Sequence, residues 1–385
     1  MNIKLKLRHM YRKVVVASDS FKGSLSSLDV ASGVEKAVHE VYPSCEVIKV
    51  NVADGGEGTM DALRETLGGR KMTITVSDPL FRPIEASYVI LDDGITAVLE
   101  MSASSGLPLL TAQERNPSKT TTLGTGELIR DALDKGCRRF LVGIGGSATN
   151  DAGMGMLHAL GYRFKDAAGH DLLPVGGSLG MVDSFDDSGI HPALTESVFI
   201  VACDVKAPLY GPEGAAYVFA PQKGADEQMV KELDGGLKHF ASVAKQIMGY
   251  DYSMDEGSGA AGGLGYAFRQ FFEADLEKGV EMVLDAVHFD DIIKGADLVV
   301  TGEGRIDGQT LTGKTPFGVA RRAIRQRISV VAIGGSVAIS PTDAELAGFD
   351  KVLQITPQNM PLEEAMKPEV ASDNVYKTIK RFLSL

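Results

Sequence analysis

This chain repeatedly places a short apolar segment before a polar, glycine-bearing loop and a helical pattern. Five segments have this form, at residues 13–18, 45–51, 297–301, 328–333 and 351–355. Because successive strand–loop–helix units connect parallel strands, they predict a parallel sheet built from both ends of the chain.

The middle of the chain follows a different pattern. Residues 84–91 and 95–101 flank Asp93-Gly94, a pair typical of a hairpin with a type I′ turn, which predicts antiparallel strands here. At 385 residues the chain is long for a single domain. We therefore predict a parallel α/β domain interrupted by a second α/β domain, with bounds 1–70 and 291–385 for the first and 71–290 for the second.

Composition excludes several classes of function. The formal net charge is −12, which argues against binding to nucleic acid or anionic membranes, because both need a basic protein surface. No apolar run approaches the length of a membrane span. The seven His residues never fall at metal-ligand spacing, and the three Cys residues are too few and too scattered for a disulfide framework. These features predict a cytoplasmic protein with reduced thiols.

The first eleven residues carry a basic bias but lack the apolar core and cleavage site of a signal peptide. We interpret them as a loose extension, with Met10 as an alternative start.

Polar loops that contain glycine follow the predicted strands or open the predicted helices. Nearly all of them carry Asp, Asn, Glu or Lys, which predicts a shared binding site for a small ligand. The six loops are residues 18–24, 53–58, 143–153, 203–214, 257–263 and 302–315.

Residues 308–315 (GQTLTGKT) match the P-loop pattern G-x-x-x-x-G-K-[ST]. A P-loop follows its strand almost directly, whereas six residues separate the predicted strand end at Thr301 from Gly308. We therefore interpret the stretch from Gly302 as a glycine-rich anion-binding loop rather than a P-loop, with Pro316 opening the next helix.

Residues 143–148 fit a relaxed form of the dinucleotide-binding fingerprint. The acidic residue that this fingerprint requires would be Asp166 or Asp171, and neither lies at a predicted strand end. We prefer phosphate binding by this loop, and a nicotinamide-dependent dehydrogenase remains an alternative.

Charged side chains gather at the predicted strand ends. Asp54, Asp204 and Asp307 follow three separate strands, and Lys22 lies in a Gly/Ser-rich loop after another strand. Converging carboxylates hold a metal ion or accept a proton, and lysine binds phosphate. Because phosphoryl transfer requires this combination, the residues alone predict a phosphate-handling enzyme with a small polar substrate.

Seven short blocks together resemble the type I glycerate kinases, in order, from about residue 13 to the C-terminus. This resemblance implies transfer of the γ-phosphoryl group of ATP to D-glycerate with Mg²⁺, and its bacterial members imply 2-phosphoglycerate as the product. It also implies a discontinuous Rossmann-like domain interrupted by a second α/β domain, with the active site in the cleft between them. The blocks are 19–24 (DSFKGS), 52–59 (VADGGEGT), 143–151 (GIGGSATND), 202–205 (ACDV), 221–225 (PQKGA), 259–263 (GAAGG) and 301–307 (TGEGRID).

The resemblance also implies roles for individual residues. Asp204 would accept the proton of the glycerate hydroxyl, with Lys22 and Asp307 as further catalytic groups. The other implied sites are substrate and phosphate contacts at Asp19, Ser20, Gly55, Gly56, Arg305 and Lys314, nucleotide contacts at Gly145, Gly146, Ser147, Asn150 and Asp151, and Mg²⁺ ligands at Glu303 and Asp54.

The chain departs from the family pattern at two places. Ser18 stands where the family usually has Pro, which predicts a looser loop at Asp19. Lys206-Ala207 stand where the family usually has Thr-Asn, which predicts a cation beside Asp204 that either lowers the pKa of Asp204 or contacts phosphate.

Three alternatives stay open at this point. The product of a glycerate kinase can be 3-phosphoglycerate, and the chain can instead be a dehydrogenase or a non-catalytic module that binds a sugar acid. A homodimer is a candidate assembly that the sequence does not decide.

Overall fold

The computed structural model describes residues 11–56 and 58–385, so the interpretation of the first ten residues, Met10 included, lies outside the described part of the chain. The chain divides into two compact units. The first unit comprises the residues up to Asp54 together with Val283–Leu385, and the second comprises Gly55–Met282. The divisions predicted after residues 70 and 290 lie elsewhere, because α2 (Thr59–Leu67) contacts strands of the second unit.

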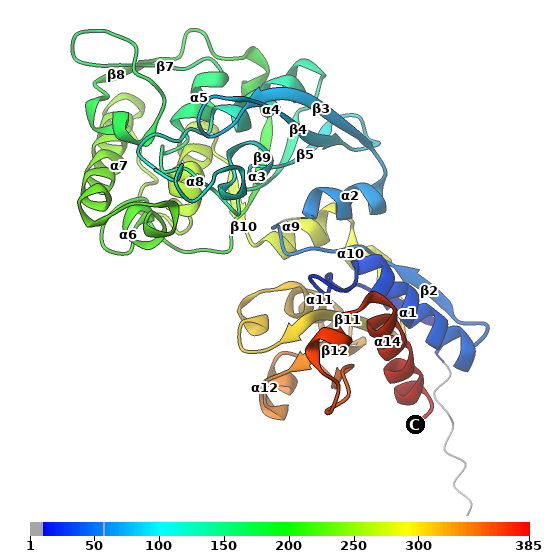
Figure 1. Ribbon diagram of the computed structural model, residues 1–385. Coiled ribbons are helices and arrows are strands. Elements are labelled where there is room, and N and C mark those ends of the chain that lie inside the picture. Colours follow the sequence, from blue (N-terminus) through cyan, green and yellow to red (C-terminus); the bar gives the residue numbers. More distant parts are fainter. Residues whose placement is uncertain (1–10, 57) are drawn as a thin grey trace, which may run out of the picture. The chain divides into compact units, whose positions relative to one another are not determined.

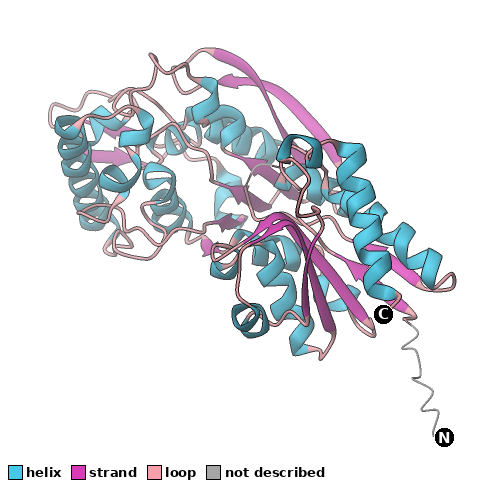
Figure 2. Cartoon of the chain, turned by 60° about the horizontal axis from the view of Figure 1, so that its bottom comes forward, coloured by secondary structure: helices cyan, strands magenta, loops and turns pink. Residues whose placement is uncertain are grey.

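Among the described residues, the first unit is built on a five-stranded sheet of order β13-β12-β11-β1-β2, in which every neighbouring pair is parallel. Renumbered within the unit, the order is 2-1-3-4-5, that of flavodoxin-like doubly wound folds. Figure 2 shows these strands as a twisted fan with helices on both sides. The elements are β1 (Lys13–Val16), α1 (Ser27–Val41), β2 (Glu46–Lys49), α10 (Phe289–Ile292), β11 (Leu298–Ile306), α11 (Thr315–Arg325), β12 (Ser329–Val337), α12 (Pro341–Leu346), β13 (Lys351–Gln354), α13 (Leu362–Ala365) and α14 (Pro368–Leu383).

The first and last long helices of the chain, α1 and α14, lie side by side against one face of this sheet (Figure 1). Ser26 caps α1, and it forms a reciprocal capping box with Asp29. Apolar residues at helical spacing, among them Val30, Val34 and Val38, are buried. Helix α11 contacts β11 and β12, so the parallel sheet is doubly wound.

Strand β11 is longer than the sequence predicts. It runs to Ile306 and stays paired with β12 to its end, where Ile306 aligns with Val337. The glycines from Gly302 onward indicated a loop, but here they allow close packing, since a Cβ on Gly302 would lie 2.4 Å from the Ile333 carbonyl oxygen. Residues 308–315 therefore follow their strand almost directly, and our reason for rejecting a P-loop was wrong.

The second unit has, among its described residues, a six-stranded sheet of order β10-β9-β6-β5-β4-β3. The pairs β3–β4 and β4–β5 are antiparallel and the others parallel, which confirms the predicted hairpin within an α/β domain. A separate hairpin pairs β7 with β8. The elements are α2, β3 (Arg70–Ser77), β4 (Pro83–Ile90), β5 (Thr96–Glu100), α3 (Ser102–Ser105), α4 (Leu123–Asp134), β6 (Arg139–Gly143), α5 (Met154–Ala159), β7 (Arg163–Lys165), β8 (Ser184–Asp186), β9 (Val198–Ala202), α6 (Ala215–Phe219), α7 (Glu227–Met248), α8 (Ala260–Phe272), β10 (Asp275–Glu277) and, across the division, α9 (Gly279–Ala286).

The turn between β4 and β5 is not the predicted type I′ turn. Gly94 has φ 73°, but Asp93 is not in the left-handed region that a type I′ turn also requires. The carboxylate of Asp93 instead accepts hydrogen bonds from the N–H groups of Ile95 and Thr96. The Asp93 carboxylate therefore holds this turn together with the backbone hydrogen bond that the Gly94 N–H donates to the Leu91 carbonyl at 3.0 Å.

Each unit buries an apolar core of its own. In the first unit Val14, Val300 and Ile333 pack under the helices. In the second, the rings of Phe140 and Phe199 stack with centroids 4.7 Å apart. A search of the described residues finds no helix with both the length and the apolar character to cross a membrane.

Candidate functional site

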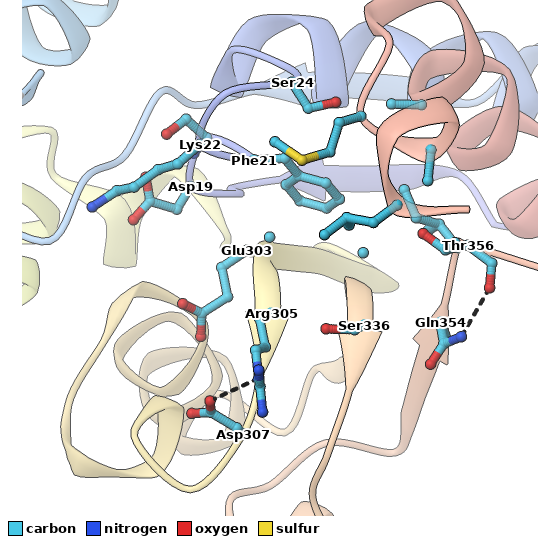
Figure 3. A pocket seen from close by; sticks show the side chains of 18 of the residues that line it. Asp19, Phe21, Lys22, Ser24, Glu303, Arg305, Asp307, Ser336, Gln354 and Thr356 are labelled. Carbon is cyan, nitrogen blue, oxygen red and sulfur yellow. Dashed lines mark hydrogen bonds and ion pairs between the residues drawn. The ribbon is translucent and has the colours of Figure 1, made fainter. Parts of the chain in front are cut away.

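A pocket with a volume of about 550 Å³ lies at the carboxyl ends of the parallel strands of the first unit (Figure 3). Its walls come from the loop after β1, the ends of β11 and β12, and the segment that follows β13. The pocket includes the junction of β1 and β11, where the strand order reverses. Doubly wound sheets bind their ligands at such a switch point.

Asp19 lies at this junction, just after β1. Its carboxylate accepts hydrogen bonds from the Ser20 N–H at 2.7 Å and the Thr315 hydroxyl at 3.1 Å. Burial, and then the negative charge of Asp54, raise the pKa of Asp19 to about 6. The carboxylates of Asp19 and Asp54 therefore lie close enough in the pocket to interact electrostatically.

Glu303 organises the loop that connects β11 to α11. Its carboxylate accepts a hydrogen bond from the Thr310 hydroxyl at 2.6 Å and pairs with the Lys314 ammonium at 3.5 Å. Thr310 in turn accepts the N–H of Asp307 at 3.0 Å. Burial raises the pKa of Glu303, and these hydrogen-bonded and charged partners oppose that effect. The pairing ties Lys314 to the pocket wall.

Arg305 and Asp307 form an ion pair of 3.1 Å at the end of β11 (Figure 3). Lys22 is exposed and borders the pocket from the loop after β1. The structure thus brings into one pocket eight of the residues that the sequence singled out, from three of the predicted loops: Asp19, Ser20, Lys22, Asp54, Glu303, Arg305, Asp307 and Lys314.

Ser18, which replaces the usual proline, does not loosen this loop. Its buried hydroxyl donates a hydrogen bond to the Gly302 carbonyl at 3.0 Å, and the Asp19 N–H donates to the same oxygen at 2.9 Å. These two bonds tie the end of β1 to β11, so the expectation of a looser loop was wrong.

An apolar wall on the same pocket escaped sequence reasoning. Phe21 and Ile355 are buried beneath it, whereas Met366 and Leu362 remain 38% and 73% exposed. The only signal was a cluster of apolar residues in a stretch without helical or strand periodicity, which carries no indication of a site by itself.

In the second unit, predicted site residues gather at the carboxyl ends of β6 and β9. Gly143 and Ala202 are paired across these strands, so the glycine loop after β6 and Asp204 after β9 leave the same edge of the sheet. Asp204 is exposed and accepts the Gly279 N–H at 3.3 Å.

The cation expected beside Asp204 has another partner. Lys206 pairs with Glu256 at 3.1 Å, and both side chains are largely exposed. Lys206 is therefore part of an exposed surface ion pair, of a kind that contributes little to stability.

Gly55 supports the same edge of the second unit. Its φ is +83°, and a Cβ there would lie 2.4 Å from Gly279 Cα and 2.7 Å from Ala202 Cβ. Gly55 therefore acts through close backbone packing, and the half-buried Gly56 follows it.

The predicted nucleotide loop divides into an exposed and a buried part. Gly145 and Gly146 are exposed and Ser147 is half-buried, but Asn150 and Asp151 are fully buried. Burial raises the pKa of Asp151, which accepts hydrogen bonds from the N–H and hydroxyl of Thr122 and the N–H groups of Gly153 and Gly155. Asp151 thus holds the loop in shape.

The dinucleotide fingerprint lacks its required context in this loop. The last residue of a fingerprint lies at the start of its helix. Here the match ends at Ala148, whereas α5 begins only at Met154. The match at residues 143–148 is therefore a coincidence of spacing.

Lys223 is a polar residue that sequence reasoning did not place in the site. It is 2% exposed, and its ammonium donates hydrogen bonds of 2.7 Å to the Ser147 hydroxyl and the Thr149 carbonyl. Burial lowers the pKa of Lys223 to about 7, against the opposing effect of Asp151. Its only sequence signal was its position in the block PQKGA.

Comparison with known proteins decides the family. The model of the glycerate kinase family matches residues 14–385. The chain belongs to the glycerate kinase family. It is 46% identical to a glycerate kinase of Bacillus subtilis (strain 168), over 92% of this chain and 93% of the relative. It is 44% identical to a glycerate 2-kinase of Escherichia coli (strain K12), over 94% and 95%.

A solved structure agrees with this assignment. The crystal structure of a candidate glycerate kinase 2 from Salmonella typhimurium LT2 has a TM-score of 0.89 and 43% identity, and the similarity covers 97% of this chain and 98% of that one. Members of the glycerate kinase family are phosphotransferases that use a nucleotide. The dehydrogenase and the non-catalytic module are thereby overturned.

Proposed function

We propose that this protein transfers the γ-phosphoryl group of ATP to D-glycerate and forms 2-phosphoglycerate. The observation that supports this most is the 44% identity, over nearly the whole chain, to a relative named glycerate 2-kinase. The pocket of the first unit supports phosphoryl transfer independently, because lysine, arginine and carboxylate side chains meet there at a switch point.

Both units carry groups that this reaction needs. In the first unit Lys22, Arg305 and Lys314 supply positive charge for phosphate oxygens, and Asp307 orients Arg305 through their ion pair. In the second unit the exposed carboxylate of Asp204 is our candidate for accepting the proton of the glycerate hydroxyl.

Asp19 and Asp54 fit a Mg²⁺ ion that arrives with the nucleotide. They line the same pocket, and the charge of Asp54 raises the pKa of Asp19, which is the behaviour of carboxylates that share a space. Glu303 is engaged with Thr310 and Lys314, so it is a weaker candidate than the sequence suggested. When bound, Mg²⁺ would neutralise phosphate charge. The described residues contain no group of three or more His, Cys, Asp or Glu side chains that could hold a metal ion.

Mg²⁺-ATP and D-glycerate should release ADP, and enolase should respond at once without added phosphoglycerate mutase, because enolase uses 2-phosphoglycerate. ADP release without the enolase signal would replace the product by 3-phosphoglycerate. The absence of ADP release would overturn the proposed reaction.

The role of Asp204 has its own test. We expect Asp204→Asn to lower kcat by roughly 100-fold or more, because a general base contributes about that factor. Glu256→Gln, an exposed carboxylate of the same unit, is the matched control. A variant with near wild-type kcat would remove Asp204 from the mechanism.

We further propose that the enzyme works in the cytoplasm. Cys45, Cys137 and Cys203 are all free thiols, as a reducing compartment requires. Thiol titration of protein purified from cells without reductant should count three thiols per chain after denaturation.

A further inference from the structure

We propose that the nucleotide binds entirely within the first unit, with its phosphates at the loop 308–315 and its base on the apolar wall of the pocket. This inference rests on the proposed function for the presence of a nucleotide donor. It departs from the sequence-based prediction, which placed the nucleotide on residues 145–151 of the second unit.

The loop 308–315 has the surroundings of a phosphate-binding loop. It joins the end of β11 at Ile306 to α11, which begins at Thr315 and runs for 11 residues. Gly313, with φ +126°, and Lys314 precede this helix directly. The N-terminus of a helix and a lysine beside it attract phosphate, and here Lys314, the residue that immediately precedes the helix, lines an existing pocket.

The contact between Thr315 and Asp19 strengthens this assignment. The Thr315 hydroxyl donates to the Asp19 carboxylate at 3.1 Å, and Asp19 follows β1, the strand parallel and adjacent to β11. In P-loop enzymes the Ser or Thr of the loop and an Asp from another strand hold the Mg²⁺ of the nucleotide together. Here residues 308–315 match the P-loop pattern and connect a strand to a helix, and Thr315 and Asp19 are already in contact.

The opposite end of the pocket suits a nucleobase. Figure 3 shows Asp19, Lys22 and Glu303 on one side and Gln354 and Thr356 on the other, with the ring of Phe21 between. This order, from charged to apolar and then neutral polar, matches the order of phosphates, ribose and base in a nucleotide.

The exposed apolar side chains at the rim lack a covering within the described part of the protein. Leu362 and Met366 keep 73% and 38% of their surface in solvent while lining the pocket. A planar base would remove that surface from water. Glycerate is a three-carbon polar acid, so it would fill only a small part of the 550 Å³ pocket and would leave the apolar wall exposed to water.

Calorimetric titration of the full-length protein with ADP, with adenosine as a competitor, tests the assignment. Leu362→Asp should weaken both ADP and adenosine by roughly 10-fold, because it places a charge against the base. Lys314→Met should weaken ADP by roughly 10-fold and leave adenosine unchanged, because only ADP has phosphates. The matched control is Leu346→Asp on α12, since Leu346 is 80% exposed and does not line the pocket.

Gly145→Asp tests the competing location. A Cβ at Gly145 would meet no atom within 4 Å and the residue is exposed, so this variant should fold, and we expect it to bind ADP as the wild type does. Wild-type ADP affinity in Leu362→Asp, or loss of ADP binding in Gly145→Asp, would overturn the inference. These titrations contain no glycerate, so they separate this inference from the proposed function, which is tested by glycerate-dependent ADP release and the enolase signal.

Discussion

Ionisation of Asp19 lowers the stability of the folded protein. Its pKa rises from 3.8 to about 6 on folding, so the folded state holds this proton more tightly than the unfolded chain does. The stability that the protonated carboxyl provides is present at low pH and is lost as the pH rises between these two values. The loss amounts to roughly 3 kcal/mol.

Asp19→Asn should abolish that loss. In metal-free buffer we expect the free energy of unfolding of the first unit at pH 8 to exceed that of the wild type by up to about 3 kcal/mol, with catalysis lost. Urea unfolding at pH 4 and pH 8 measures the difference. Glu345→Gln, an exposed residue of α12, serves as the control. An unchanged pH dependence in Asp19→Asn would show that this carboxyl is not the group responsible.

Lys223 acts on the second unit through the glycine loop that its hydrogen bonds hold in place. Its two hydrogen bonds fix the glycine loop at Ser147 and Thr149. Lys223→Met keeps the volume and removes the ammonium, so we expect kcat/KM for D-glycerate to fall by roughly 10- to 100-fold while the KM for ATP stays near that of the wild type. Lys231→Met, at an exposed position of α7, should change neither value. An equal rise of both KM values would contradict this role.

At the scale of elements, both sheets have glycines near their carboxyl ends at positions where a larger side chain would collide with neighbouring atoms. Gly55 is one tight case, because it combines φ +83° with a backbone atom only 2.4 Å from the point that a Cβ would occupy. Gly55→Ala should destabilise the second unit by roughly 3 kcal/mol, through overpacking and backbone strain together.

Gly136→Ala separates these two costs. Gly136 also has positive φ, at +94°, but a Cβ there would meet no atom within 4 Å. We expect a loss of only about 1–2 kcal/mol, from backbone strain alone. Chemical unfolding of the two variants compares them directly, and equal losses would exclude close packing as the reason for glycine at residue 55.

At the scale of the whole molecule, two separate cores predict unfolding in more than one step. Each unit has its own apolar cluster, so the chain need not behave as a single cooperative system. If the nucleotide binds in the first unit, ADP at 100 times its Kd should stabilise that unit by about 2.7 kcal/mol.

Hydrogen exchange in moderate urea resolves the two units. ADP should slow exchange in β1, β11 and α11 and leave the peptides that contain residues 145–151 unchanged. Protection confined to the second unit would place the nucleotide there instead.

Local sequence patterns determined many of the helices and strands of this protein, but not the residues at which its two units divide. The apolar runs at Val14 and Val299 became buried parallel strands, and Ser26 capped its helix, because period, capping and β-branching act over a few residues. The seven blocks also identified the family, which the comparisons confirmed. They further indicated most of the charged residues that meet in the pocket.

Tertiary structure decided what local patterns cannot express. Whether Gly302 to Ile306 formed a loop or a strand depended on β12, a partner of equal length, and that pairing moved the loop 308–315 next to its strand. The environments of Asp151 and Lys223 depended on burial by distant segments. The apolar wall of the pocket joined Phe21 to Leu362 across most of the chain. Such contacts arise from close packing between residues far apart in sequence, so no periodicity records them.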